Sequence, residues 1–342
     1  MRNEICLLLG AGFSKSVDSQ MPLMSDLAKV VYSDPKFLPL AKASDTTKRL
    51  LNLLDGPTAN VEDYLQHLSE SSVYLSEEDI HRRQRLAEVV QDRIVEEIEN
   101  KSRDAVIPKS LVQLIRNLSD SNVPVLTTNY DTLIERAYCD LGQIGSNGAS
   151  TPIDLIPIVA DYAFDRVGLR AVGQNRNISS LSIIKLHGSI DWYSPGELSE
   201  ELCIHGSDQT LPIEFRKHVL QSEIDIEGMR RIIALPSPNK KNIINQAVMR
   251  KVWREARRSL HSTSRLIIVG SEIHKLDQSL RALLRESLPA GSSVHVLNQK
   301  KSSCDAVREL LPEISITFTE VSKIEEVKEV IDSYLGSPNS AP

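Results

Sequence analysis

The chain has 342 residues, of which 41% are hydrophobic and 25% are charged, and its formal net charge is −6 at pH 7. This composition excludes intrinsic disorder and suffices for one large domain or two smaller ones. The acidic balance argues against strong, nonspecific binding of nucleic acid. In the most basic stretch, 250–265, arginines alternate with apolar residues at helical spacing, so we interpret it as a solvated helix face.

Short aliphatic and β-branched runs predict seven buried strands, most of them followed by a helical pattern. This alternation favours an α/β fold with a Rossmann-like, mainly parallel sheet and helices on both faces. The predicted strands cover residues 5–9, 123–127, 183–186, 231–235, 266–269, 294–297 and 314–318.

A long, mostly helical segment, 36–120, separates the first two strands. Apolar stripes recur there at helical spacing, such as Leu86, Val90, Ile94 and Ile98, and they predict a helical subdomain inserted into one domain that covers 1–335. The stretches 142–181 and 193–230 lack periodicity and are predicted to be loops or small insertions. The last residues, 336–342, are predicted to be a flexible tail.

The cysteines and the apolar runs bear on metal binding and on the cellular location of the protein. Cys6, Cys139, Cys203 and Cys304 lie far apart, with no CxxC pair and no His/Cys cluster at ligand spacing, so we expect no metal site. The first apolar run is too short for a signal peptide, and no segment approaches the ~20 apolar residues that cross a bilayer. We therefore expect a cytoplasmic protein without a membrane anchor.

Two glycines, Gly10 and Gly12, follow the first predicted strand in the run LLLGAGFS. Glycine lets a ligand approach the backbone, and a helix that starts near Phe13 would offer its N–H groups to a phosphate. The third glycine of a GxGxxG fingerprint is replaced by Lys15, so the match to a dinucleotide loop is partial. The alternative is an ordinary strand-to-helix turn.

The run VLTTNYD ends a second predicted strand in polar residues. Ligands of open parallel sheets bind beyond the carboxyl ends of the strands, which places Asn129 and Asp131 where a sugar or amide could be held. The alternative is that Thr128 or Asn129 only caps a helix over 131–141.

A third strand leads into the run KLHGSIDW. The pKa of an unperturbed histidine lies near neutrality, which suits His187 to proton transfer. A lone histidine is more often structural, but this one, before Gly188 at a strand end, is a better catalytic candidate than the other seven histidines.

Together, GAGFS, TTNYD and KLHGSIDW, in this order and each after a strand, resemble the sirtuin superfamily, in particular its prokaryotic sirtuin-like branch that hydrolyses NAD. Gly270 and Ser271 after a later strand, with Asp277 downstream, and Asn298 at the end of another add to the resemblance. It spans about 5–335.

The resemblance implies that NAD is the substrate and assigns roles to individual residues. Asn129 and Asp131 would hold the nicotinamide-side ribose and position the attacking water, and His187 would be the general base or a partner of the ribose. The residues implied to bind the rest of NAD are Gly10, Ala11, Gly12, Phe13 and Ser14 at the pyrophosphate, Gly270, Ser271 and Asn298 at the adenosine, and Thr128.

In two features the sequence differs from the sirtuins that deacylate proteins or from the usual loop of the superfamily. Protein-deacylating sirtuins carry a zinc ribbon of two CxxC pairs beside the acyl-lysine cleft, and this sequence has none, which argues against a deacylase. The loop from Lys15 to Pro22 is longer than usual and lacks the customary glycine before the proline.

The leading hypothesis is therefore an NAD⁺ hydrolase that releases nicotinamide and ADP-ribose and depletes NAD in bacterial anti-phage defence. The defence role comes from the resemblance alone. We expect its control by homo-oligomer assembly or by a partner protein, such as a nucleic-acid-handling ATPase or nuclease. The alternatives are a catalytically silent module that binds NAD or an ADP-ribose signal, and an ADP-ribosyl or acyl transferase.

Overall fold

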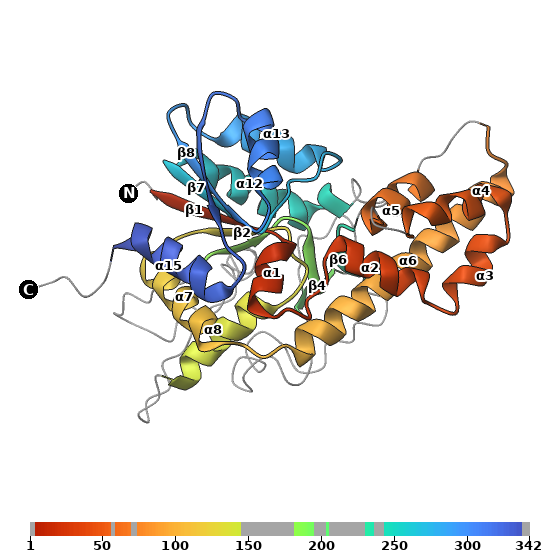
Figure 1. The fold of residues 1–342 in the computed structure, drawn as a ribbon, viewed down its shortest axis with the longest axis horizontal. Coiled ribbons are helices and arrows are strands. Elements are labelled where there is room, and N and C mark those ends of the chain that lie inside the picture. Colours follow the sequence, from red (N-terminus) through yellow and green to blue (C-terminus); the bar gives the residue numbers. More distant parts are fainter. Residues whose placement is uncertain are drawn as a thin grey trace, which may run out of the picture.

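The computed structural model describes residues 4–55, 59–69, 74–144, 181–194, 203–204, 230–235 and 243–336. Six strands form one parallel sheet in the order β3-β2-β1-β7-β8-β9. Their bounds are β1 Ile5–Leu9, β2 Val125–Thr127, β3 Ile183–Lys185, β7 Arg265–Val269, β8 Ser293–Asn298 and β9 Ser315–Glu320. Of these strands, β8, β7, β1 and β2 are labelled in Figure 1. The predicted α/β fold with a Rossmann-like parallel sheet is confirmed.

Helices cover both faces of this sheet, and β1 in its middle is buried on both sides. Leu7 and Leu9 belong to a core cluster with α7, α8 and α15, whereas Cys6 and Leu8 belong to a cluster with α12, α13 and α14. This alternation explains why β1 is a continuous apolar run. The helices are α1 Ala11–Val17, α7 Lys109–Asp120, α8 Leu133–Ile144, α12 Ala247–His261, α13 Gln278–Ser287, α14 Lys301–Leu310 and α15 Ile324–Leu335.

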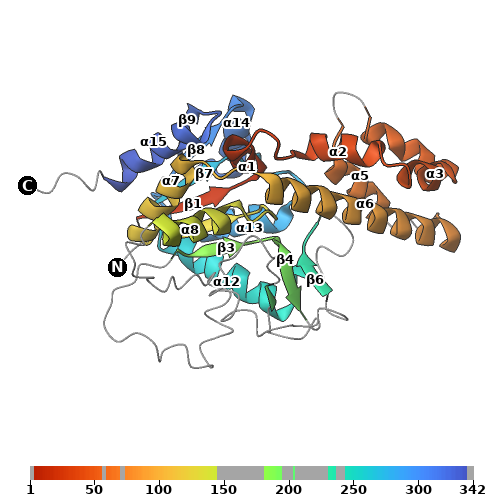
Figure 2. The same ribbon diagram turned by 90° about the horizontal axis from the view of Figure 1, so that it is seen from below.

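One predicted strand lies in a different sheet. The sequence pattern predicts 231–235 as one of the strands of the mainly parallel sheet. In the structure, β6 Arg230–Ile233 instead pairs antiparallel with β4 Gly188–Ser194, and β4 also pairs with β5 Cys203–Ile204. Figure 2 shows β4 and β6 side by side next to α6. The apolar run of β6 marks a buried strand, but apolarity alone does not reveal which strand it pairs with.

A group of helices between β1 and α7, which we call the helical unit, packs around a third core cluster that also includes Ile190 of β4 and Ile233 of β6. The predicted stripe on α6, which includes Leu86 and Ile98, is buried in this core, where Phe37 and Tyr64 also meet edge to face. In Figure 1 the unit lies to one side of the parallel sheet. The predicted insertion bounds, 36–120, stay a prediction. The elements of the unit are α2 Met24–Tyr32, α3 Phe37–Lys42, α4 Asp45–Lys48, η1 Arg49–Leu53, α5 Val61–Ser69 and α6 Glu77–Asp104.

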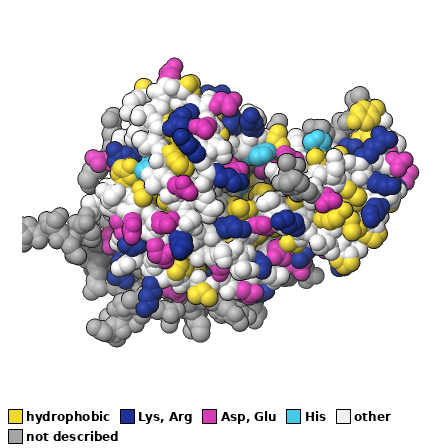
Figure 3. All heavy atoms as spheres, in the orientation of Figure 1, with side chains coloured by type: hydrophobic (Ala, Val, Ile, Leu, Met, Phe, Trp, Pro, Cys, Tyr) yellow, Lys and Arg dark blue, Asp and Glu magenta, His cyan; other side chains and the backbone are white. Residues whose placement is uncertain are grey.

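The basic stretch 250–265 is mostly α12, whose apolar side packs on the sheet through Val252, Ala256 and Leu260. Arg254 and Arg257 are exposed, as expected of a solvated helix face. Acidic and basic side chains are interspersed on the face of the molecule seen in Figure 3.

The predicted tail after Gly336 and most of the predicted loops at 142–181 and 193–230 lie outside the described residues. Within the part of the chain that the structure describes, no helix has the length and apolarity needed to cross a membrane.

Gly188 can be tested as a requirement of the turn between β3 and β4. Its φ is +76°, and a Cβ there would come within 2.1 Å of the carbonyl oxygen of Ile232. Gly188→Ala should therefore lower the free energy of unfolding by about 3 kcal/mol or more, measured by urea denaturation.

Gly291 is the matched control, because its φ is +84° but no atom lies within 4 Å of a Cβ built there. Gly291→Ala should lower the free energy of unfolding only by the backbone strain, about 1–2 kcal/mol. An equal decrease in the free energy of unfolding in the two variants would show that the close approach of the Ile232 carbonyl is not the reason that glycine is required at position 188.

Candidate functional site

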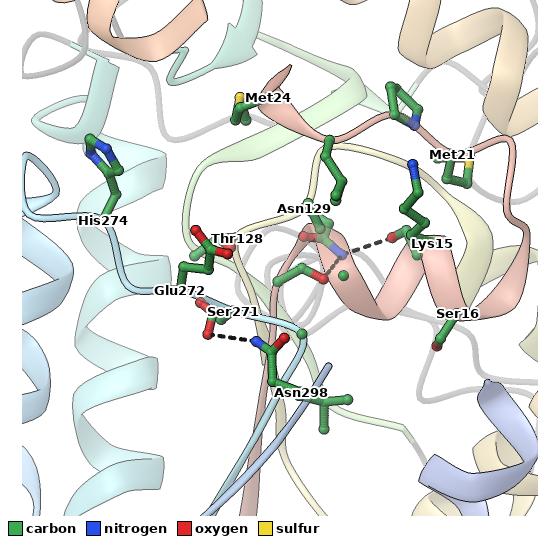
Figure 4. A pocket seen from close by; sticks show the side chains of 18 of the residues that line it. Lys15, Ser16, Met21, Met24, Thr128, Asn129, Ser271, Glu272, His274 and Asn298 are labelled. Carbon is green, nitrogen blue, oxygen red and sulfur yellow. Dashed lines mark hydrogen bonds between the residues drawn. The ribbon is translucent and has the colours of Figure 1, made fainter. Parts of the chain in front are cut away.

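A cavity of about 480 Å³ lies at the carboxyl ends of the central strands of the parallel sheet. The helical unit forms its other wall, where Leu27 of α2, Glu62 of α5 and Ile98 of α6 line it. Asn129 and Asn298 reach it from different strand ends (Figure 4). Sites for small molecules and cofactors commonly span about 300–1,000 Å³, so the cavity has the size of a ligand site.

Backbone hydrogen bonds continue between the strands past their ends. Thr128 N donates to Leu9 O at 3.0 Å, and Gly10 N donates to Val269 O at 2.9 Å. The loops after β1 and β2 therefore leave the sheet in fixed directions, and their side chains reach the cavity from a rigid base.

The loop after β1 packs directly on the loop after β7. A Cβ on Gly10 would lie 2.7 Å from Ser271 Cα, and a Cβ on Gly12 would lie 2.8 Å from Gly270 Cα. Gly12 N donates to Gly270 O, and Phe13 N donates to Gly10 O, both at 2.8 Å. The glycines thus permit backbone contact between two loops, and these two amides are already hydrogen-bonded within the chain.

A buried polar network joins this loop to the loop after β2. Asn129 Nδ2 donates to Gly10 O at 2.9 Å and to Ser14 Oγ at 2.8 Å, and Ser14 Oγ donates to Asp131 Oδ2 at 2.6 Å. Asp131 Oδ1 accepts from Leu133 N at 3.2 Å. The network fixes the orientation of all three side chains at the cavity.

The cap alternative for Thr128 and Asn129 is wrong. Helix α8 begins at Leu133, and the carboxylate of Asp131 accepts from its first N–H. The side-chain amide of Asn129 donates to Gly10 O in the loop after β1 instead, and the residue lines the cavity.

Lys185 lies beneath this network, 1% exposed. Its Nζ donates to Asp131 O at 2.5 Å and to Glu135 Oε1 at 2.8 Å. Burial lowers the pKa of Lys185, but the carboxylates of Glu135, Asp191 and Asp131 outweigh burial, and the pKa is raised overall. Burial raises the pKa of Glu135, with Lys185 opposing. The ammonium group therefore stays charged, and its hydrogen bond to Asp131 O fixes the loop after β2.

His187 lies in the turn between β3 and β4 and is buried. Its carbonyl accepts from Ala234 N at 2.8 Å. Its Nε2 is 2.9 Å from Asp277 Oδ2, although the ring N–H is not aligned with that oxygen. The ring lies 6.2 Å from that of Tyr130, between centroids. Burial raises the pKa of Tyr130, helped by the negative charges of Glu62 and Asp277, so its phenol stays neutral.

Residues at the ends of β7 and β8 also line the cavity. Asn298 Nδ2 donates to Ser271 O at 3.4 Å (Figure 4). Glu272 and Lys300 form an exposed ion pair at 3.3 Å beside them. A carboxamide, a hydroxyl and two opposite charges thus lie where hydroxyl groups of a ligand could be bound.

At the edge of the cavity, the helical unit contacts the loop after β7. His274 Nδ1 is 3.7 Å from Glu62 Oε2, and its Nε2 is 3.9 Å from Asp63 Oδ1. Ile273, next to this contact, has φ +43°, an uncommon conformation for a β-branched residue. The contact joins the helical unit to the sheet at the cavity's edge.

Eleven of the twelve residues that the sequence nominates line this one cavity, and their roles stay predictions. Phe13 is the twelfth: it is buried in the core cluster that contains Leu9 and Val269. The lining set is Gly10, Ala11, Gly12, Ser14, Thr128, Asn129, Asp131, His187, Gly270, Ser271 and Asn298. No group of three or more His, Cys, Asp and Glu side chains among the described residues is placed to hold a metal ion.

Four further polar residues belong to the site although the sequence analysis assigns them no role in it: Lys185, Tyr130, Asp277 and Glu62. Lys185 and Tyr130 lie inside the nominated motifs, so their position next to Asp131 and His187 was a usable signal. Asp277 carries only the weaker signal of following the GS pair. Glu62 lies on a helix of the helical unit, and no pattern in the sequence connects that helix with the strand ends.

Comparison with known protein families identifies the family of this chain. A family model described as a SIR2-like domain matches residues 123–310. The chain belongs to the SIR2-like domain family. No curated protein matches it in sequence.

Solved Sir2 structures resemble the SIR2-like chain at low similarity. A Sir2 homologue in complex with NAD is 14% identical with a TM-score of 0.45, and the match covers 97% of this chain and 91% of that one. A mutant Sir2 homologue in complex with ADP-ribose is 14% identical with a TM-score of 0.43, at the same coverage.

Lys185→Met tests the buried charge beneath the cavity. The variant leaves the Glu135 carboxylate and the Asp131 carbonyl without their partner, so the free energy of unfolding should fall by about 3–5 kcal/mol. Because the pKa of Lys185 is raised in the folded state, its stabilising effect should be complete below pH ~10 and decrease as the pH rises further. Urea denaturation across this pH range measures both effects.

Lys301→Met is the control on the surface, where the change should stay within about 0.5 kcal/mol. Adding Glu135→Gln to Lys185→Met should recover part of the lost stability, since no unpaired carboxylate then remains. Additive losses in the double variant would contradict the pairing.

Proposed function

We propose that this SIR2-like protein is an NAD⁺ hydrolase that releases nicotinamide and ADP-ribose. The observation that carries the proposal is the convergence of Ser14, Asn129, Asp131 and His187, from three strand ends, on one cavity of ligand size. The sequence motifs of these residues resemble the NAD-hydrolysing branch of the sirtuins, and family membership supports the same substrate.

The chemistry matches the charge distribution of the cavity. When the bond between nicotinamide N1 and ribose C1′ breaks, its electron pair passes to the ring, and positive charge moves onto the ribose. The Asp131 carboxylate and the side-chain oxygen of Asn129 offer negative charge and a fixed dipole to that ribose. Because the polar network holds both groups in place, they stabilise the transition state without reorganising.

His187 supplies the proton acceptor of the second half of the reaction. Water adds to C1′, its oxygen forms the new C–O bond, and its proton passes to the imidazole. The products are nicotinamide, ADP-ribose and one proton. Burial of the histidine beside the neutral Tyr130 keeps its ring away from bulk water, and the residue lines the cavity that would hold the ribose.

The remainder of the dinucleotide extends toward the ends of β7 and β8 in this proposal. Gly10, Ala11, Gly12 and Ser14 line the part of the cavity that would hold the pyrophosphate, and Gly270, Ser271 and Asn298 would line the adenosine part. Residues of both halves of the proposed site, from His187 to Asn298 in the sequence, line the same cavity.

We propose on the resemblance alone that the activity depletes NAD in bacterial anti-phage defence. Such an enzyme must be inactive until it is needed. Self-assembly or a partner protein, such as a nucleic-acid-handling ATPase or nuclease, would then control it.

Asn129→Ala and His187→Ala test the assignment. With purified protein, alone and with its candidate partner, each variant should lower kcat for nicotinamide release from NAD⁺ by about 100-fold or more, since each loses a group that acts on the reacting ribose. Chromatography of nicotinamide and ADP-ribose measures the rate.

Asn52→Ala and His81→Ala are matched controls, because both side chains are exposed on the helical unit and both variants should keep full activity. Hydrolysis that survives Asn129→Ala and His187→Ala would overturn the site. NAD⁺ binding by calorimetry without nicotinamide release would favour the silent module, and labelling of a protein by tagged NAD⁺ would favour a transferase.

A further inference from the structure

We propose that Asp277 is the positioning residue for His187, an inference that rests on the proposed function for its kinetic part. Asp277 directly precedes α13, and both it and His187 are buried. Its Oδ2 lies 2.9 Å from His187 Nε2. Two parts of the chain that are distant in sequence thus bring a carboxylate and an imidazole together at the cavity wall.

The helix cap made by Asp277 does not by itself require a carboxylate. Its Oδ1 accepts from Leu280 N at 3.2 Å and thereby caps α13. Asparagine or serine would cap the helix about as well without a charge. A buried charge is costly unless it is paired, and the second oxygen of this carboxylate faces the imidazole.

The carboxylate determines which ring nitrogen of His187 carries the proton. Negative charge beside Nε2 favours the tautomer with its proton on Nε2, and it stabilises the imidazolium that forms when the other nitrogen accepts a proton. Nδ1 is then the atom that meets the ribose or the attacking water. The ring N–H is not aligned with Asp277 in the free protein, and such contacts often tighten when the substrate binds.

The backbone of His187 is already fixed, which leaves the ring as the part to be oriented. Ala234 N donates to its carbonyl at 2.8 Å, and the following Gly188 adopts φ +76° in a turn that has no room for a Cβ. The ring of Tyr130 limits the imidazole on one side, with ring centroids 6.2 Å apart. Asp277 provides the polar contact to Nε2 that the packing does not.

Asp277→Asn separates the two roles of this residue. The amide oxygen can still cap α13, so the melting temperature should stay within about 2 °C of the wild type. The amide NH₂ then faces His187 Nε2 and turns it into an acceptor, which moves the ring proton to Nδ1. ¹⁵N NMR of the His187 ring in the free protein should show this change of tautomer. The kcat for NAD⁺ hydrolysis should fall about 100-fold or more, with KM changed less than about 3-fold.

Asp277→Ser is the second variant, since serine keeps the cap but does not reach the imidazole, and it should show a similar loss of kcat. Asp305→Asn, an exposed aspartate on α14, is the matched control and should change neither signal. An unchanged tautomer and an unchanged kcat in Asp277→Asn would overturn the proposal. If the wild type does not hydrolyse NAD⁺ but the tautomer still changes, the proposed function fails and the positioning of His187 by Asp277 stands.

Discussion

The backbone contact between the loop after β1 and the loop after β7 is the constraint on which the site depends. At Gly10 and Gly12 there is no room for a Cβ, because the backbone of Gly270 and Ser271 lies directly against them. The two loops therefore meet at the middle of the parallel sheet. Parallel pairing then aligns the ends of β2 and β3 with the same edge. The candidate residues converge because of strand order and register, and their loops have little freedom to arrange themselves otherwise.

A layer of buried polar groups makes this edge rigid. Ser14, Asn129 and Asp131 are bonded to one another, and Lys185 holds the same loop from below with its charge balanced by Glu135. Such a network costs desolvation energy and stabilises the fold only when its members are all satisfied. What it provides is a single geometry, which catalysis by fixed dipoles and charges requires.

The helical unit contributes to the site as well as to the size of the chain. Its core cluster is distinct from the two clusters of the parallel sheet but includes Ile190 of β4 and Ile233 of β6. Glu62 lines the cavity and contacts His274 from the loop after β7. The cavity therefore has one wall from the sheet and one from the helices. Any change in the packing of α5 against that loop would alter the space that a ligand meets.

The sequence by itself determined the parallel sheet, most of its strands, the apolar stripes of the helices and the polar residues at the strand ends. Strand periodicity, helical spacing and the position of a residue after a strand are local properties, so a single chain displays them. Only the tertiary structure placed β6 in an antiparallel sheet with β4, brought Asp277 to His187 and put Glu62 in the cavity. These are contacts between segments far apart in the chain, and no local pattern specifies them, because they arise from how the elements pack.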